Sequence, residues 1–143
     1  MDLKKKALTK SLWVFHMSTA SCNNCDIEIL DCLTPRHDLE RFGITLIGSI
    51  RHADVILATG IVNRNCRDIV KKLYEQAPKP CFVVAVGTCT AGRGIFHNSY
   101  NAIEAETLDR IIPVDAYIPG CPPKPEAIIG GILKLIDKVK GKK

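Results

Sequence analysis

Short apolar runs alternate along this chain with segments of helical periodicity. The runs have the length of β-strands and are rich in β-branched residues, and they occupy residues 12–17, 44–50, 54–59 and 81–86. The last of them, CFVVAV, is apolar throughout, which is typical of a strand buried on both faces of a parallel sheet. Residues 111–118 predict one more strand, and Pro113 inside that run places it at a sheet edge.

Three helices are predicted between and after these strands. Residues 23–33 form the first, which ends before Thr34-Pro35. The second carries one apolar face made of Cys66, Ile69, Val70, Leu73, Tyr74 and Ala77, and the third covers residues 125–140 with Pro125 in its first turn. Strands in alternation with helices predict an α/β fold: a flavodoxin-like three-layer sandwich with a mainly parallel sheet of four to five strands.

The net charge of +5 is concentrated at the two ends of the chain. We expect one α/β domain over residues 11–140, preceded by a basic extension at 1–10 and followed by a basic tail at 141–143. Nucleic-acid binding is not expected, because such folds carry their basic residues on the folded surface, often interleaved with aromatic residues. We also expect no secretory signal, because no apolar segment with a small-residue cleavage site follows the basic start, and no apolar run is long enough to span a membrane.

The seven cysteines divide into two groups by their position relative to the predicted strands. Four of them follow strand ends, where the loops of a parallel sheet converge on one edge: Cys22, Cys25, Cys89 and Cys121. Cys32 and Cys66 fall inside predicted helices and Cys81 opens a strand, so we interpret these three as packed core thiols.

Four convergent thiols predict a metal centre. Cys22 and Cys25 form a C-x-x-C at a helix start, where free backbone N–H groups stabilise anionic sulfur. One close pair with two distant single cysteines fits an iron–sulfur cluster better than a zinc ribbon, which uses two close pairs. A thioredoxin-type dithiol would leave Cys89 and Cys121 unexplained, and a zinc-based or thiol-based cytosolic domain stays an alternative.

Residues 87–94 resemble a phosphate-binding loop, but Arg93 and Gly94 replace the required Lys and Ser/Thr.

Four motifs occur in the order found in one family. They are SCNNCDIEI at 21–29, VGTCTAGRGIF at 86–96, SYN at 99–101 and IIPVDAYIPGCPPKPEAI at 111–128. Through them the chain resembles, over about residues 11–139, the small electron-transfer subunit of energy-converting, membrane-bound group 4 NiFe hydrogenases. That subunit is related to the 20 kDa cluster subunit of respiratory complex I. The resemblance implies a flavodoxin-like fold without flavin and one 4Fe–4S cluster held by Cys22, Cys25, Cys89 and Cys121.

The resemblance also implies a function in a larger complex. Two residues separate Cys22 from Cys25, whereas the complex I subunits have adjacent cysteines, so the hydrogenase branch is favoured. The expected role is electron relay between ferredoxin-like iron–sulfur subunits and the NiFe centre of a partner large subunit. Membrane subunits would hold this ion-pumping complex, with the chain peripheral on the cytoplasmic side. The alternative is the equivalent subunit of a complex I-like oxidoreductase that reduces quinone or sulfur.

Four further residues carry separate predictions. Glu28 lies three positions after Cys25, on the same side of the predicted helix, and is a candidate for proton transfer or for contact with a partner. His16 and His97 are expected to be structural histidines with satisfied hydrogen bonds. Arg93 is expected either to offset cluster charge or to meet an acidic partner.

Overall fold

The computed structural model describes residues 11–100, 107–139 and 141. Its five strands form one sheet in the order β2-β1-β3-β4-β5, and every neighbouring pair is parallel. The strands are β1 (Leu12–Ser18), β2 (Ile44–Ile47), β3 (Val55–Thr59), β4 (Phe82–Val86) and β5 (Ala116–Ile118). This strand order is that of flavodoxin-like folds and confirms the predicted α/β class.

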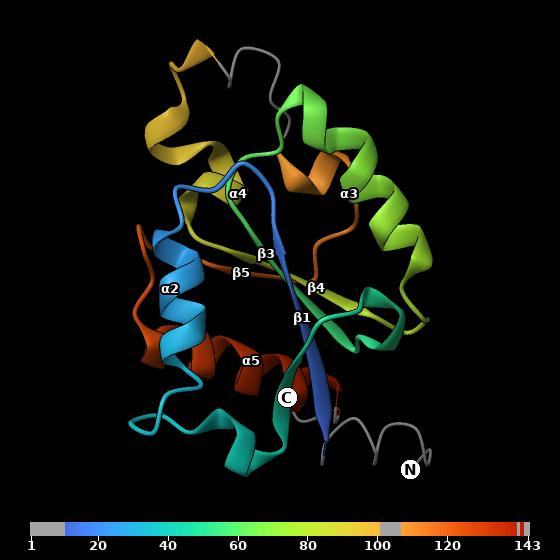
Figure 1. Ribbon diagram of the computed structural model, residues 1–143, viewed down its shortest axis with the longest axis vertical. Helices are drawn as coiled ribbons and strands as arrows, with labels where there is room; N and C mark the ends of the chain where they lie inside the picture. Colours follow the sequence, from blue (N-terminus) through green and yellow to red (C-terminus); the bar gives the residue numbers. More distant parts are fainter. Residues whose placement is uncertain (1–10, 101–106, 140, 142–143) are drawn as a thin grey trace.

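Helices cover both faces of the sheet (Figure 1). On one face lie α2 (Asn24–Asp31) and α5 (Pro125–Val139), and on the other lies α3 (Arg64–Gln76). The short helix α4 (Thr88–Gly92) follows β4. Single 3₁₀ turns complete the described elements: η1 (Leu39–Phe42), η2 (Ile50–His52), η3 (Gly94–Phe96) and η5 (Leu108–Arg110).

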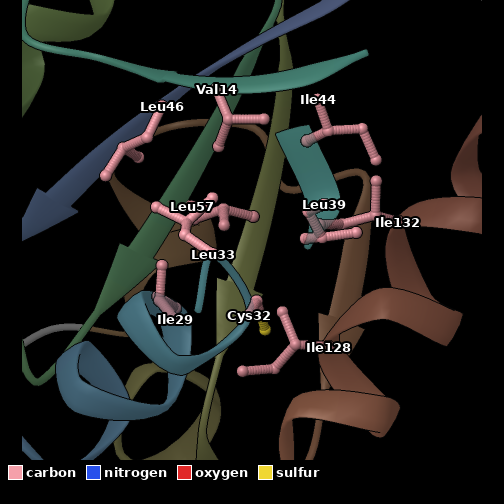
Figure 2. Close-up of a pocket in the computed structure, with 10 residues that line it drawn as sticks. All are labelled: Val14, Ile29, Cys32, Leu33, Leu39, Ile44, Leu46, Leu57, Ile128 and Ile132. Carbon is pink, nitrogen blue, oxygen red and sulfur yellow. The ribbon is translucent and has the colours of Figure 1, made fainter. Parts of the chain in front are cut away.

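The core is divided by the sheet into two apolar layers. Ile56, Val83 and Val70 belong to the layer beneath α3, while Val14, Leu57 and Ile128 belong to the layer beneath α2 and α5. The second layer encloses a small apolar cavity of about 20 Å³ between α2, η1, α5 and the sheet (Figure 2). Strands β3 and β4 have almost entirely buried side chains, and for β4 the fully apolar sequence predicts this burial.

The structure corrects several details of the predicted elements. The run at 111–118 forms a strand only from Ala116, because Pro113 and a turn precede it. Residues 87–94, expected as a loop, include the short helix α4. Ile69 is predicted on the buried face of α3 but is 58% exposed, and Cys32 lies at the C-cap of α2 rather than inside a helix.

The predicted domain bounds extend beyond the described part of the chain. The expected basic extension at residues 1–10 lies outside the described residues, as do residues 142–143 of the expected tail. Asn101 of the SYN motif lies outside them as well. The predicted boundaries at 11 and 140 therefore stay a prediction.

Four strands end side by side at the carboxyl edge of the sheet. In the register, Ser18 pairs with Thr59, Thr59 with Val86, and Val86 with Ile118. Each of these residues is the last of its strand. The loops that follow β1, β3, β4 and β5 therefore start in one row, and three of them carry the four predicted ligand cysteines.

Candidate metal centre at the carboxyl edge of the sheet

The loop between β1 and α2 carries Cys22 and is fastened to the neighbouring strand. Thr19 N donates to Thr59 O (3.0 Å) and Ala20 N donates to Ile61 O (3.0 Å), so the loop lies along the end of β3. Asn23 adopts a left-handed conformation with φ 69°, which lets the chain turn into α2 immediately after Cys22. The thiols of the C-x-x-C pair are therefore held at the start of α2.

The loops that carry Cys89 and Cys121 are tied directly to each other. Thr88 N donates to Gly120 O (2.9 Å), and the Thr88 hydroxyl donates to the same carbonyl (3.0 Å). Gly87 N donates to Ile118 O (2.8 Å), which extends the pairing of β4 with β5 beyond the strand ends. These bonds hold the segment before Cys89 against the segment before Cys121.

Two glycines let the backbone approach the sulfur atoms. Gly87 has φ 89°, and a Cβ at this position would lie 2.7 Å from the Sγ atom of Cys25, which follows a different strand. A Cβ at Gly94 (φ 49°) would lie 3.0 Å from the Sγ atom of Cys89. Both positions require glycine for their positive φ and for the close approach. Gly87, between β4 and α4, thus packs against the Cys25 thiol in the first turn of α2.

The four predicted ligand cysteines lie within electrostatic reach of one another. The pKa of Cys25 is raised to about 11, mainly by burial. The negative charges of the neighbouring Cys89, Cys22 and Cys121 thiolates and of Asp26 contribute to the same increase. Burial also raises the pKa of Cys89, where a hydrogen bond from the backbone N–H of Ile95 acts in the opposite direction. Cys25 and Cys89 are buried while Cys22 and Cys121 are exposed, so the group lies at the surface with two thiols facing outward. The sequence-based prediction that the segments after β1, β4 and β5 converge at one edge agrees with this placement.

The remaining three cysteines lie elsewhere in the fold. Cys32 is buried beneath α5 and its thiol donates to Glu28 O (3.2 Å), and Cys81 is buried in the layer beneath α3. Cys66 is part of the apolar face of α3. Burial raises the pKa of Cys32 and of Cys81 to about 11. Their packing agrees with the interpretation of all three as core thiols.

The other predicted residues have different surroundings. Glu28 is partly buried on α2, one turn beyond Cys25. His16 contacts Asp26 and Thr59 through Nε2 (3.0 and 3.2 Å), so it is a structural histidine, as predicted. His97 is exposed, and Arg93 has a left-handed backbone (φ 69°) at the end of α4.

Sequence reasoning missed Asp26 and its partners. The Asp26 carboxylate contacts His16, Ser18, Ser21 and Thr59. Two features of the sequence could have pointed to it: Asp26 is a charged residue directly after the C-x-x-C pair, and the buried strand β3 ends in a residue with a hydroxyl group, Thr59. Nothing in the spacing shows that this strand end and the carboxylate meet.

The donor set fits a cluster that has several metal ions. Within the described ranges, no three Cys, His, Asp or Glu side chains lie close enough together to hold a single ion. Tetrahedral zinc at 2.3 Å from sulfur would need thiolates about 3.8 Å apart. An iron–sulfur cluster accepts a wider arrangement, because each thiolate binds a different iron. Four thiols from three loops, approached by glycine backbone, are suited to such a group.

Comparison with known proteins identifies the family. Residues 22–135 match the family described as the 20 kDa subunit of NADH ubiquinone oxidoreductase. The chain belongs to this family. The match begins at Cys22 and includes all four cysteines of the candidate centre, and the resemblance inferred from the sequence motifs is confirmed.

Two of the similar proteins carry the names of oxidoreductase subunits. A probable membrane-bound hydrogenase subunit, mbhJ, of Pyrococcus furiosus is 50% identical over 94% of this chain and 79% of its own length. An NADH-quinone oxidoreductase subunit of Amoebophilus asiaticus is 41% identical over 99% of this chain and 86% of its own. An uncharacterized protein of Methanocaldococcus jannaschii is 44% identical over 95% and 90%.

One solved structure supports the same assignment, and a more distant one shows the same fold. A chain of the membrane-bound sulfane sulfur reductase, an archaeal respiratory membrane complex, superimposes with a TM-score of 0.83 and 42% identity, covering 99% of this chain and 77% of that one. A chain of an NAD⁺-reducing NiFe hydrogenase superimposes with a TM-score of 0.63 at 20% identity, over 93% of each chain, and shares the fold. In the described part of this chain, no helix combines the length and the apolarity needed to cross a bilayer.

Proposed function

We propose that this chain carries one 4Fe–4S cluster, bound by Cys22, Cys25, Cys89 and Cys121, and relays electrons within a membrane-bound oxidoreductase complex. The observation that carries the proposal is the convergence of these four thiols, from loops after three parallel strands, at one edge of the sheet. Family membership and the relatedness to hydrogenase and quinone oxidoreductase subunits support it.

When bound, such a cluster supplies one-electron transfer. The chain's own residues hold it and control its surroundings. Cys25 and Cys89 would bind it from the buried side, and the Ile95 N–H donates to the Cys89 sulfur, a kind of hydrogen bond that tunes cluster potentials. Cys22 and Cys121 are exposed, so this side would face a partner subunit. We expect a ferredoxin-like subunit to deliver electrons and a large subunit to take them up at a NiFe centre, with membrane subunits completing the complex.

The proposal is tested by anaerobic purification of the whole chain, followed by metal and sulfide analysis. We expect about four irons and four acid-labile sulfides per chain and a paramagnetic signal after reduction. Cys121→Ser should abolish or severely lower both contents, whereas Cys66→Ser, on α3, should leave them unchanged. Zinc in place of iron, or equal iron in the two variants, would contradict the proposal.

Glu28 is proposed to act in proton transfer or at the partner interface. It is partly buried on α2, one turn from Cys25. In the assembled complex, Glu28→Gln should slow turnover by about 10²-fold or more if Glu28 moves a proton, with unchanged iron content. Asp31→Asn, at the end of the same helix, is the matched control. Unchanged turnover and unchanged subunit recovery in Glu28→Gln would rule out both roles.

A second candidate function is supported by the similarity to the sulfane sulfur reductase chain, at 42% identity with a TM-score of 0.83. In that case the partner large subunit would lack nickel, and the chain would deliver electrons for the reduction of sulfur. Metal analysis of the co-purified complex separates the two functions. Nickel together with hydrogen uptake supports the hydrogenase function, and a nickel-free complex that reduces polysulfide supports the alternative.

A further inference from the structure

The carboxylate of Asp26, in the first turn of α2, has hydrogen-bonding partners on β1, on β3 and in the loop that carries Cys22. Asp26 Oδ1 accepts from the Thr59 hydroxyl at the end of β3 (2.5 Å) and lies 3.0 Å from His16 Nε2 on β1. Asp26 Oδ2 accepts from Ser21 Oγ (3.0 Å) in the cysteine loop and from Ser18 Oγ (3.3 Å) at the end of β1. Together these five residues form the Asp26 hub: His16, Ser18, Ser21, Asp26 and Thr59.

The hub is a fixed part of the fold rather than a surface contact. Thr59 is fully buried, and the side chain of Asp26 is only 13% exposed. Three hydroxyl groups, those of Thr59, Ser21 and Ser18, donate to the two oxygens of this carboxylate. Hydrogen bonds to a carboxylate are stronger than those between neutral groups.

The hub reaches the backbone between the two cysteines. The Asn23 N–H donates to Ser21 Oγ (2.9 Å), and Ser21 in turn donates to Asp26. Asn23 holds the left-handed conformation that turns the chain from Cys22 into α2. Asparagine adopts this conformation more readily than most residues other than glycine. The hydrogen bonds that link Thr59, Asp26, Ser21 and Asn23 connect this turn to the end of β3.

We propose that Asp26 is a positioning residue for the cluster: anchored by Thr59, it sets the orientation of the Cys22–Cys25 loop and therefore the placement of both thiols. This inference rests on the proposed function. Asp26 acts through the backbone of the loop, by way of Ser21 and Asn23, rather than through a ligand sulfur. Hydrogen-bonding partners beyond the ligands commonly orient metal ligands, and their loss typically weakens metal binding about 10- to 100-fold.

The sharpest test changes Thr59, because it lies in a different segment from the cysteines. Thr59→Val keeps the shape of the side chain and removes its donor, whereas Thr59→Ser keeps the donor. In Thr59→Val we expect a chelator to remove iron about 10- to 100-fold more readily, with altered paramagnetic g-values and a shifted reduction potential. Thr59→Ser should restore the wild-type signal and potential.

A second pair of variants tests the carboxylate itself. Asp26→Asn replaces one carboxylate oxygen by an NH2 group, which donates hydrogen bonds. The side chain can then no longer accept hydrogen bonds from all of its partners. It should reproduce the effects of Thr59→Val, while Asp31→Asn, on the same helix but outside the hub, should match the wild type. Thermal unfolding of each metal-free chain shows whether the variants fold.

The outcomes separate the two proposals. If the wild type holds no cluster, the proposed function fails and this inference fails with it. If the wild type holds the cluster and folded Thr59→Val and Asp26→Asn keep its iron retention, g-values and potential, only the positioning role of Asp26 is overturned.

Discussion

Gly60 sits where β3 ends and the cysteine loop crosses it. Its φ is +85°, and a Cβ at this position would lie 2.6 Å from the backbone nitrogen of Ser21. Backbone atoms cannot move aside as the end of a side chain can. The residue type at position 60 therefore determines how closely the loop before Cys22 can approach the sheet.

We expect Gly60→Ala to lower the free energy of unfolding by at least about 2 kcal/mol, because it combines left-handed strain with a backbone clash. Gly48→Ala is the matched control, since nothing lies within 4 Å of a Cβ there, and it should change stability by less than about 0.5 kcal/mol. Urea unfolding of the metal-free chains measures both. Equal stabilities for the two variants would contradict the close packing of the loop on β3.

The buried thiols Cys32 and Cys81 make stability depend on pH in the alkaline range. Burial raises the pKa of each to about 11 from a usual value of 9.0. The folded chain keeps these protons between pH 9 and 11 while the unfolded chain loses them, so stability is complete below about pH 9 and declines as pH rises toward 11. Cys81→Ala should make this decline shallower, as measured by urea unfolding at a series of pH values. An identical pH dependence in wild type and variant would show that Cys81 is not protected from ionisation.

At the scale of elements, α5 packs on the short edge strand β5 through a glycine. A Cβ at Gly131 would lie 2.6 Å from Cδ1 and 2.8 Å from Cγ1 of Ile118, whereas a Cβ at the adjacent Gly130 meets nothing within 4 Å. Ile118 is the last residue of β5 and precedes the loop to Cys121. The contact between helix and strand thus bears on the position of that loop.

Gly130→Ala should therefore stabilise the fold by about 0.5–1 kcal/mol, through the higher helix propensity of alanine. Gly131→Ala gains the same propensity but must displace Ile118, and it should be at least about 1 kcal/mol less stable than Gly130→Ala. Thermal unfolding compares the two. A Gly131→Ala variant as stable as Gly130→Ala would mean that α5 is not in close contact with β5.

Sequence patterns predicted well those elements whose type follows from the pattern of apolar side chains within the element itself. Strand β4 was predicted from an unbroken apolar run, β3 from a β-branched run of strand length, and α5 from the apolar residues that share one helix face. Helix α4 has only five residues, too few to show a period, and it was missed. The strand β5 was predicted too long, because Pro113 was interpreted as a residue within an edge strand, whereas pairing with β4 starts only after it, at Ala116.

In the candidate site, too, some features follow from the sequence while others depend on contacts between distant segments. Cysteine spacing together with the order of strands predicted which four thiols gather, since the ends of parallel strands meet at one edge. The Asp26 hub could not be predicted, because Thr59 reaches Asp26 only through the register of β1 against β3. The need for glycine at position 87 likewise depends on the Cys25 sulfur, which comes from a distant loop.

At the scale of the whole molecule, large apolar side chains remain exposed near the candidate metal centre. Ile27 and Leu30 lie on the outer face of α2, and Ile95 follows α4. Ile27 is 61% exposed and Ile95 is 70% exposed. Exposed apolar groups around a functional site are typical of surfaces that bind another protein. Under the proposed function, the large subunit would cover them.

Ile27→Ser should leave the stability of the isolated chain nearly unchanged and weaken its association with the large subunit by about fivefold or more. Ile69→Ser on α3 is the matched control, because Ile69 is similarly exposed (58%) on the opposite side of the sheet. Co-purification of the complex from cells that express each variant gives the comparison. Equal recovery with both variants would place the interface elsewhere.

The four thiols are contributed by segments that follow the first, fourth and fifth strands, and the bond from Thr88 to Gly120 forms only when the last strand joins the sheet. Under the proposed function, a chain still emerging from the ribosome would hold no complete set of ligands until β5 and the loop to Cys121 were made. Cofactor delivery would then follow the joining of β5 to the sheet, so that only copies with all five strands in place receive iron and sulfide.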